Sequence, residues 1–457
     1  MHKELENFER NHVWDLVEPP PNCRPIGTKW VFKNKQGEDG MVVRNKARLK
    51  EEIDYEETFA PVAHLKAIRI LLAFATSKGF KLQQMDVKYA FLNGFIEEEV
   101  YVRQPPGFES ARFPDRSGFV MGSVDKTLFL LSRGGDTLIV QIYVDDIIFG
   151  RSSHALVSSF AEQMSREFEM SLMGELQFFL GLQSKQGLEG IFVHQAKYTR
   201  DILKKFEMGD SKPMTTPMST NTALDADEDG KAMDQKEFQG MIGSLLYLMA
   251  TRPDIQFSSS SGEAHFQLGP WYSSGSSLSL RGFSDADHAG CRIDRKSTSG
   301  TCQLLGTSLV SWSSRKQASV ALSTTEAEYV AAASLYSQLL WMKATLSDFG
   351  LRFGRIPVQV DSTSAISVAK NPVLHSRTKH IDVRFHFLRD HYEKGDIDLI
   401  HVVSANQLAD IFTKPLEFDA FTRLSGELGV IGWRCVDNAL IKGEIESQWT
   451  GFIALLV

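Results

Sequence analysis

The sequence predicts a mixed protein of the α+β or α/β class that is divided into several domains. Its 457 residues are enough for about three domains, and 42% apolar together with 23% charged residues is typical of a globular protein. Apolar residues recur with the period of a strand in some segments and of a helix in others. Residues 258–280 are rich in Ser and Gly and have no clear period, which predicts a domain boundary between two such patterns.

The first pattern begins in residues 1–60, where short strands alternate with turn residues. A helix follows, because Ile68, Leu71, Leu72 and Ala75 share one helical face and Gly79 provides a stop. The next elements are predicted in the order strand, hairpin, helix, hairpin, helix and helix, at residues 80–94, 138–150, 154–170, 175–195, 196–208 and 236–250.

The second pattern starts near Leu280 and runs to the end of QLADIFTKPL. It reads as a strand, a hairpin, a long helix, a strand and a final helix, at residues 279–290, 299–314, 325–350, 357–366 and 406–414. Strands that are followed by alternating helix and strand predict a mixed sheet covered by helices.

Composition excludes several classes of protein. The net charge of −7 argues against a uniformly basic nucleic-acid-binding protein. Basic residues nevertheless gather in residues 24–50, 292–300 and 375–391, which are either solvated faces or contacts to phosphates. The four cysteines form no C-x-x-C pair, so neither a zinc knuckle nor a disulfide framework is indicated, and a reducing compartment fits. We predict no signal peptide and no membrane-spanning segment.

Two adjacent carboxylates, Asp145 and Asp146, interrupt the apolar segment IVQIYVDDIIFG. One explanation is a tight hairpin turn, where Asp is common. The other is a metal site, because a carboxylate beside buried strands is unfavourable unless it is paired or bound to metal. Asp86, in QQMDV, is either a strand-end cap or the partner of Asp145. Together they would suit a two-metal site, in which ions about 3.5–4 Å apart bridge the oxygens of a phosphoryl transfer.

The second pattern contains four more carboxylates that are candidates for a metal site: Asp285, Glu326, Asp361 and Asp410. Each also has a simpler explanation. Glu326 lies three residues after Ser323, as in a capping box, Asp361 could cap the helix after it, and Asp410 could lie on the surface. Their order on strand, helix start, strand end and late helix favours a second acidic site.

Ordered blocks of sequence resemble the reverse transcriptase–ribonuclease H part of a copia-type LTR retrotransposon Pol polyprotein. They include TKWVFKNK, DYEETFAPVA, QQMDVKYAFLNGFIEEEVYVRQPPGF, IYVDDIIFG, SDADHAGCRIDRKSTSG, SWSSRKQASVALSTTEAEY, HSRTKHIDVRFHFLRDH and QLADIFTKPL. They occur in family order over nearly all of residues 1–416.

The resemblance implies a right-hand reverse transcriptase followed by an RNase H-like domain. Its parts would be fingers at 1–60, palm at 61–195, thumb-like helices at 196–257, a truncated connection at 258–280, an RNase H-like mixed sheet with helices at 281–416 and a non-family tail at 417–457. The implied activities are RNA-directed DNA polymerisation and cleavage of RNA in RNA–DNA hybrids. The implied partners are an RNA template, a DNA primer, the hybrid and deoxynucleoside triphosphates. Intact elements of this family act in cytoplasmic virus-like particles during transposition.

The resemblance also implies two active sites, each with two Mg²⁺ ions. The polymerase residues would be catalytic Asp86, Asp145 and Asp146, of which Asp86 and Asp145 bind metal. Phe91 would lie under the sugar, unless it is an ordinary core residue, and Arg48 would contact the triphosphate. Asp285, Glu326, Asp361 and Asp410 would be the catalytic and metal-binding residues of ribonuclease H. His375, His380 and His386 suggest either zinc or, by resemblance, a basic segment along the hybrid.

This copy lacks three stretches that its family carries: one after residue 50, one between Gly107 and Asp125, and one within residues 258–280. The middle stretch would hold a nucleotide-contacting Gln and a helix behind the palm sheet. Its loss is expected to leave one apolar sheet face bare, at roughly 25 cal/mol per Å². We therefore expect impaired polymerase activity. The alternative is an inactive remnant that at most binds nucleic acid.

Overall fold

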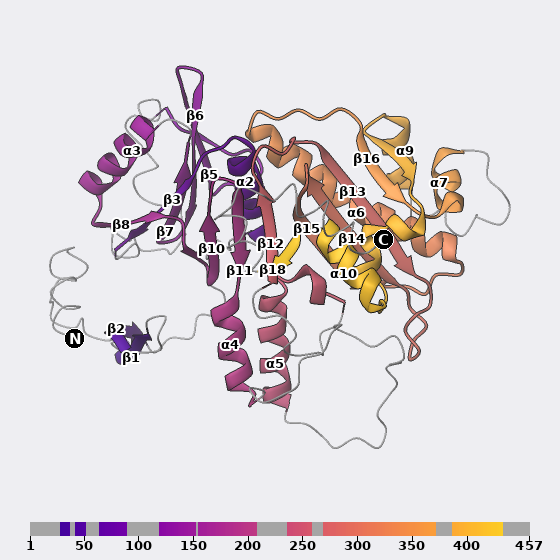
Figure 1. The fold of residues 1–457 in the computed structure, drawn as a ribbon, viewed down its shortest axis with the longest axis horizontal. Coiled ribbons are helices and arrows are strands. Elements are labelled where there is room, and N and C mark those ends of the chain that lie inside the picture. Colours follow the sequence, from indigo (N-terminus) through magenta and orange to yellow (C-terminus); the bar gives the residue numbers. More distant parts are fainter. Residues whose placement is uncertain are drawn as a thin grey trace, which may run out of the picture.

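The computed structural model describes residues 28–36, 42–51, 64–88, 118–151, 154–207, 235–257, 268–371 and 386–432 (Figure 1). The strands are β1 Thr28–Gln36, β2 Val42–Glu51, β3 Leu82–Val87, β4 Val120–Met121, β5 Leu128–Arg133, β6 Asp136–Tyr143, β7 Asp146–Gly150, β8 Met170–Glu175, β9 Phe178–Phe179, β10 Leu182–Gln186, β11 Gly190–His194, β12 Leu268–Ser273, β13 Leu280–Asp287, β14 Thr298–Leu305, β15 Ser308–Lys316, β16 Ile356–Val360, β17 Ile397–His401 and β18 Val430–Gly432. The α-helices are α2 Leu65–Ser77, α3 His154–Glu167, α4 Ala196–Lys205, α5 Gln235–Leu248, α6 Thr324–Asp348, α7 Thr363–Lys370, α9 His386–Glu393 and α10 Phe418–Glu427, and the 3₁₀ helices are η2 Pro253–Ile255, η3 Ser404–Asn406 and η4 Leu408–Phe412.

The predicted mixed α and β architecture is confirmed. The described strands form one two-stranded, one six-stranded and two five-stranded sheets, with helices between and around them. The division into fingers, palm and thumb stays a prediction. Within the described residues, no helix combines the length and the apolar character needed to cross a membrane.

The six-stranded sheet has the order β4-β5-β6-β7-β3-β8, and all its pairs are antiparallel. Because side chains alternate along a strand, β5 sends Phe129 and Leu131 to one face and Leu128 and Leu130 to the other. The first face packs against α3, where the rings of Phe149 and Phe160 lie 5.0 Å apart. The predicted hairpins at 138–150 and 175–195 are both present.

The opposite face of this sheet is covered, although the sequence predicted it to be bare. Its apolar side chains share one core with α2 and with α6 from the second half of the chain. The Phe74 ring of α2 lies 5.1 Å from the ring of Phe349 just after α6, and Lys66 donates a hydrogen bond to Gln338. The prediction was wrong because it considered only the helix expected between Gly107 and Asp125, whereas the cover comes from α2, which precedes the sheet, and from α6 in the second half of the chain.

Helix α2 is buried on all sides, because every residue from Ala67 to Thr76 is buried. Its Arg69 guanidinium donates hydrogen bonds to the carbonyl oxygens of Ala250 at 2.7 Å and Val310 at 3.4 Å, and it lies 3.8 Å from the ring centroid of Trp312. Burial lowers the pKa of Arg69 to about 10, which still leaves it charged at neutral pH. A cation with carbonyl and aromatic partners therefore joins the two halves of the chain.

One sheet is built from three distant parts of the sequence, in the order β18-β12-β11-β10-β9. Strand β12, which lies between β18 and β11, falls in residues 258–280, which were predicted to be a linker without a period, and residues 258–267 lie outside the described part. Gly269 allows β12 to approach β11 closely, because a Cβ there would lie 1.9 Å from the Val193 carbonyl oxygen. Gly269 and Pro270 are unusual in strands and interrupt the apolar alternation of the sequence, so this strand was not predicted.

Residues 418–432 of the predicted tail belong to the fold. Leu424, Leu428 and Val430 are buried in a core with strands β13 and β14, and β18 pairs with β12. The rest of that tail, residues 433–457, lies outside the described residues.

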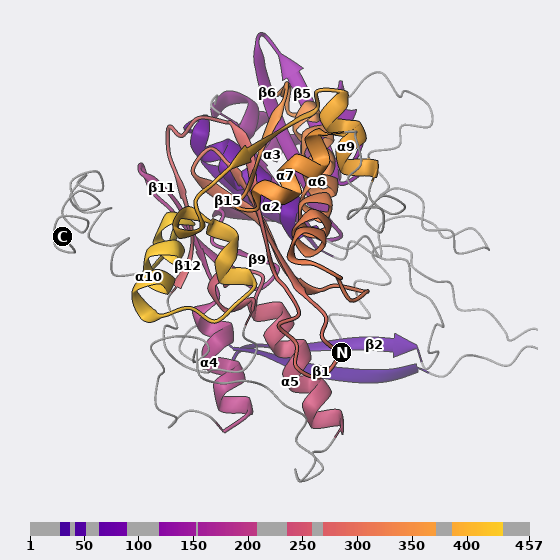
Figure 2. The same cartoon turned by 90° about the vertical axis from the view of Figure 1, so that its right-hand side faces the viewer.

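The second large sheet has the order β15-β14-β13-β16-β17. Strands β13, β14 and β15 are antiparallel, and β13, β16 and β17 are parallel, as predicted for a mixed sheet. Helix α6 covers one face through Leu335 and Leu339, whereas η4 and α10 cover the other. Figure 2 shows this unit packed directly beside α2.

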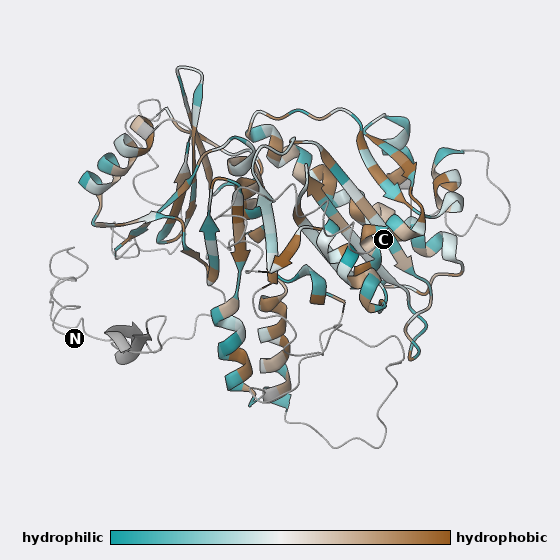
Figure 3. Cartoon of the chain, viewed as in Figure 1, coloured by the Kyte–Doolittle hydropathy of each residue, from teal (hydrophilic) through white to brown (hydrophobic). Residues whose placement is uncertain are grey.

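Helices α4 and α5 project from the sheets as a pair (Figures 1 and 2). The Tyr198 hydroxyl donates a hydrogen bond to the Ser244 carbonyl at 3.1 Å, and the rings of Tyr198 and Tyr247 meet edge-on at 4.7 Å. Figure 3 shows that α5 is the more apolar of the two and α4 the more polar. The two helices predicted at 196–208 and 236–250 are present, and their role as a thumb stays a prediction.

Candidate metal centre

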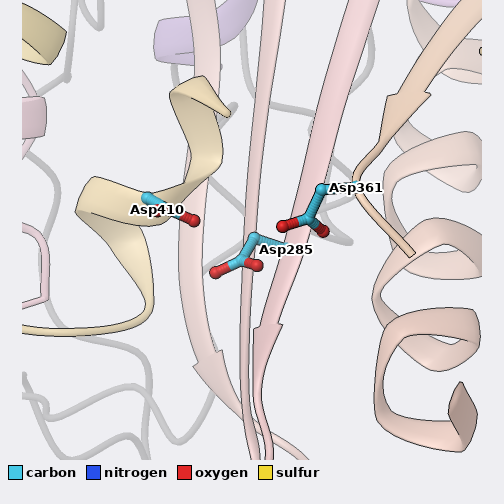
Figure 4. A group of neighbouring side chains, drawn as sticks. All are labelled: Asp285, Asp361 and Asp410. Carbon is cyan, nitrogen blue, oxygen red and sulfur yellow. The ribbon is translucent and has the colours of Figure 1, made fainter. Parts of the chain in front are cut away.

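Three aspartates converge on the second large sheet. Asp285 lies on β13, Asp361 directly follows β16, and Asp410 lies in η4. One oxygen from each carboxylate lies within 4.8 Å of the others, and Figure 4 shows the three side chains pointing into a common space. Among the residues that the structure describes, this is the group of His, Cys, Asp or Glu side chains that is close enough to hold a metal ion.

The sheet topology brings Asp285 and Asp361 together. Strands β13 and β16 are adjacent and parallel, and Ser284 pairs with Val360. The next residue of each strand is the aspartate, so both carboxylates emerge at the same end of the sheet. Asp361 does not cap the helix that follows, because the Ser362 hydroxyl accepts the Ala365 N–H at 3.2 Å. This removes the simpler explanation for Asp361.

Asp361 is held instead by a residue of η3, the 3₁₀ helix that follows β17. The Ser404 hydroxyl donates a hydrogen bond to Asp361 Oδ2 at 3.0 Å. The side chain is half-buried, whereas Asp285 and Asp410 are buried.

Asp410 reaches the site on a 3₁₀ helix, not on the predicted α-helix. The N–H of Asp410 bonds to the Gln407 carbonyl and the N–H of Thr413 to the Asp410 carbonyl, which is the i to i+3 pattern. The buried Gln407 side chain accepts the Ala409 N–H at 3.2 Å and donates to the Ser284 carbonyl at 2.8 Å. It therefore ties the start of η4 to the strand that carries Asp285.

Gly300 permits the close approach of η4. It lies on β14, directly paired with Asp285. A Cβ at this position would lie 2.7 Å from the Ala409 carbonyl oxygen and 2.6 Å from Thr413 Cγ2. The sequence showed Gly300 only as part of RKSTSG, and the packing that requires it is not visible there.

Gly300→Ala is expected to push η4 away from β14, because the closest obstacles include backbone, and to lower the melting temperature by several degrees. Ser299→Ala, one residue earlier on the same strand, is the matched control and should have a smaller effect. Differential scanning calorimetry of both variants checks this. Equal melting temperatures for Gly300→Ala and wild type would contradict the close approach.

Glu326 does not join the aspartates. Its N–H donates to the Ser323 hydroxyl at 3.1 Å, and its carboxylate accepts the Leu322 N–H at 2.7 Å. This resembles a capping box at the start of α6, except that the carboxylate accepts the N–H of Leu322 and not that of the N-cap residue Ser323. The structure supports that explanation and corrects the prediction that Glu326 is a metal ligand.

Glu328 is the glutamate that faces the site, and the sequence interpretation missed it. It is 8% exposed, and one carboxylate oxygen accepts the Ala286 N–H at 3.2 Å. The other oxygen, Oε2, is buried and receives no hydrogen bond from the described residues. Helical period could have found it, because Glu328 falls on the buried stripe of α6: Glu328, Ala332, Leu335 and Leu339.

Negative charge in the site is only partly compensated. Burial, and then the carboxylates of Asp285 and Asp361, raise the pKa of Glu328 to about 9. Burial and the Asp285 carboxylate raise the pKa of Asp410 to about 7. Lys414 Nζ lies 3.0 Å from Asp410 Oδ1 and 3.9 Å from Asp285 Oδ2. Burial opposes the charge of Lys414, but these carboxylates outweigh it, so the Lys414 pKa is raised.

The donor set suits a hard divalent cation. Carboxylate oxygens are the ligands that Mg²⁺ prefers in proteins, and Glu328 Oε2 is a buried acceptor that receives no hydrogen bond from the described residues. Burial and then the neighbouring carboxylates raise the pKa values of Glu328 and Asp410, and a bound cation would offset the repulsion from those carboxylates. The residues that would hold it are Asp285, Glu328, Asp361 and Asp410.

The raised pKa of Glu328 predicts a pH dependence of stability in a metal chelator. Between its ordinary value of 4.5 and about 9, the folded protein keeps a proton on Glu328 that the unfolded chain releases. The free energy of unfolding should therefore fall as the pH rises through this window. Glu328→Gln should flatten the fall, and Glu326→Gln, the matched control, should not. Urea unfolding between pH 6 and 9 measures this, and identical slopes for wild type and Glu328→Gln would contradict it.

The first acidic group lies on the six-stranded sheet. Asp86 on β3 is directly paired with Asp146 on β7, and Gln84 donates to Asp146 Oδ1 at 3.3 Å. Asp145 lies in the two-residue turn between β6 and β7, and its carbonyl accepts the Val87 N–H at 2.7 Å. These aspartates therefore come together on neighbouring strands. Within the described chain they do not form a group as tight as the one around Asp285.

The turn itself is unusual. Val144 has φ 57°, a conformation that β-branched residues rarely adopt. Strain of this kind is of order 1–3 kcal/mol and gathers at functional sites. Both explanations of the Asp pair, tight turn and metal site, are therefore compatible with the hairpin.

The structure describes the remaining predicted site residues only in part. Arg48 lies on β2, paired with Val31, but its side chain is not among those described. Phe91, His375 and His380 lie outside the described residues, and His386 begins α9. Their predicted roles stay predictions.

Comparison with known proteins gives consistent similarities. The family model described as "Reverse transcriptase (RNA-dependent DNA polymerase)" matches residues 11–117 and 111–220. The chain is 36% identical over 479 residues to the "Retrovirus-related Pol polyprotein from transposon RE1" of Arabidopsis thaliana, covering 92% of this chain and 33% of that protein. It is 32% identical over 488 residues to that from transposon TNT 1-94 of Nicotiana tabacum, covering 92% and 37%. The chain thus spans about a third of the length of these relatives.

Two further results qualify the similarity. The alignment with RE1 runs over 479 positions, more than the 457 of the whole chain, so that relative carries segments that this chain lacks. Among solved structures, an N-terminal RNase H domain from Mycobacterium tuberculosis, fused to maltose-binding protein, is 14% identical and covers 33% of this chain and 98% of that one. Its TM-score of 0.22 is too low to bear on the fold.

Proposed function

The chain belongs to the family of copia-type retrotransposon Pol polyproteins with a reverse transcriptase domain, and from this membership we propose that its second large sheet carries a ribonuclease H activity. The substrate would be the RNA strand of an RNA–DNA hybrid. The observation that supports this most strongly is the acidic group of Asp285, Asp361 and Asp410 with Glu328 beside it.

The chemistry of the donors supports a metal-dependent hydrolysis. Two Mg²⁺ ions, when bound, would activate water and neutralise charge at the phosphate. Asp285 and Asp361, at adjacent strand ends, would hold cations rigidly, because both strands are hydrogen-bonded within the sheet. Glu328 and Asp410 would complete the ligand set from α6 and η4. Ser404 and Thr413 would fix carboxylate orientations, since each donates a hydrogen bond to one of the aspartates.

The direct test is cleavage of a labelled RNA strand in a hybrid by the purified full chain with Mg²⁺. Cleavage that stops on chelation, and that spares the same RNA when it is single-stranded, is expected. A well-folded chain that binds the hybrid without cutting it would support the alternative of an inactive remnant.

For the six-stranded sheet we propose an RNA-directed DNA polymerase site at Asp86, Asp145 and Asp146 that is impaired in this copy. The pairing of Asp86 with Asp146 and the turn position of Asp145 favour the assignment. The substrates would be a primed RNA template and deoxynucleoside triphosphates. The segments missing relative to RE1 favour the impairment.

Incorporation of deoxynucleotides on a primed RNA template with Mg²⁺ is therefore expected to be weak or absent. The reason is the loss, between Gly107 and Asp125, of a block that contacts the nucleotide in relatives. A primer-extension gel measures it, with Asp145→Asn as the control for any residual signal. Robust extension that Asp145→Asn abolishes would show that the missing block is dispensable.

A further inference from the structure

The acidic group of the second large sheet already contains a cation from the chain itself. Lys414 Nζ lies 3.0 Å from Asp410 Oδ1 and 3.9 Å from Asp285 Oδ2. These carboxylates are two of the three whose oxygens gather within 4.8 Å. An ammonium at contact distance from both would repel a divalent cation bound to the same carboxylates.

The backbone beside Lys414 is fixed. Thr413 is fully buried, and its hydroxyl lies within hydrogen-bond distance of the Asp285 carboxylate and, at 3.1 Å, of the Asp410 carbonyl, to either of which it can donate. The Lys414 N–H also bonds to the Asp410 carbonyl at 3.3 Å. These hydrogen bonds hold the Lys414 backbone beside the two carboxylates.

The side chain of Lys414 is free to leave. It is 39% exposed, in contrast to 4% for Asp285 and 11% for Asp410. Its four-carbon stem is flexible and its ammonium is readily hydrated. The ammonium can thus exchange the two carboxylates for water without movement of η4.

We propose that Lys414 is the resident counter-cation of this acidic group, that it competes with divalent cations for the Asp285 and Asp410 carboxylates, and that it swings out when they bind. The inference rests on the proposed metal-dependent function. It makes Lys414 a residue that sets the metal affinity of the site: it stabilises the metal-free state and weakens cation binding.

The test is a titration of the full chain with Mn²⁺, in which electron paramagnetic resonance measures the concentration of the free ion. The reference is Asp361→Asn, since subtracting its binding isolates the ions held by this acidic group. Lys414→Met keeps most of the stem and removes the charge, so it should bind Mn²⁺ roughly tenfold more tightly than wild type, within the usual range of such couplings. Lys414→Arg, which keeps the charge, should stay close to wild type.

A second readout is thermal stability. In chelator, Lys414→Met should melt below wild type, because the carboxylates lose their counter-cation, and the rise in melting temperature on adding Mg²⁺ should be larger than in wild type. The matched control is Lys316→Met, which removes an ammonium that lies 2.9 Å from Asp294 on the same sheet. It should leave the Mn²⁺ affinity unchanged.

The outcomes separate the two proposals. If wild type binds Mn²⁺ in an Asp361-dependent manner and Lys414→Met binds it equally or more weakly, the role of Lys414 is refuted while the metal site stands. If wild type shows no Asp361-dependent binding, the metal-dependent function fails and this inference fails with it. If Lys414→Met does not fold, Lys414→Gln replaces it with the same expectations.

Discussion

Asp361→Asn is expected to reduce cleavage of the RNA strand in an RNA–DNA hybrid at least about a hundredfold. Loss of a group that only supports a metal ligand already lowers affinity or activity 10–100-fold, and Asp361 is proposed as a ligand itself. The measurement is the initial cleavage rate by the full chain at saturating Mg²⁺.

The same substitution should leave the metal-free fold intact or stabilise it, because it relieves repulsion among clustered carboxylates. Asp398→Asn is the matched control: Asp398 lies on the adjacent parallel strand β17 but outside the acidic group. It should cut the hybrid at the wild-type rate. Cleavage that is indifferent to Asp361→Asn would refute the assignment of the site.

Arg69→Met is expected to destabilise both halves of the chain together, by roughly 2–4 kcal/mol. Hydrogen bonds from a charged group contribute about 1.5–3 kcal/mol each, and Arg69 makes two, of which one is long. The substitution also leaves buried carbonyl oxygens of Ala250 and Val310 without this donor. Because the six-stranded sheet, α2 and α6 share one core, unfolding should occur in a single transition that shifts as a whole.

Urea unfolding followed by circular dichroism, with hybrid cleavage measured along the same series, checks this. Arg166→Met is the matched control, since Arg166 is 79% exposed and forms only a surface pair with Glu162; its effect should stay below about 0.5 kcal/mol. Two separate transitions, of which Arg69→Met moves only one, would contradict the shared core.

The sequence was most informative where neighbours along the chain decide the structure. The β6–β7 hairpin around Asp145, the helix α2 with its stop at Gly79 and the strand-end position of Asp361 follow from local period and turn residues. Gly79 indeed has φ 68°, which favours glycine. The local pattern also predicted three residues of the second acidic group, Asp285, Asp361 and Asp410, because the ends of parallel strands in a mixed sheet meet at one edge.

The sequence was least informative where two local signals compete, or where the packing partners lie far apart along the chain. Glu326 carried the clearer local signal, a capping box, and was assigned to the site, whereas Glu328, only two residues later, faces the aspartates. The choice depends on which side of α6 meets the sheet, which burial decides and capping does not. Strand β12 was missed because Gly269 and Pro270 resemble a linker until β11 and β18 flank it.

The sheet that joins β11, β12 and β18 has a consequence for synthesis on the ribosome. In the nascent chain, strand β11 gains its partner β12 once Ser273 is translated, but β12 must then wait for its own partner β18 until Val430 is translated. At about 5–20 residues per second, the wait of β12 lasts roughly ten to thirty seconds, during which one of its edges is open to other chains. Folding therefore cannot finish one half before the other is made. A stop codon just before Val430 would damage not only the last unit but also the half of the protein that was translated first.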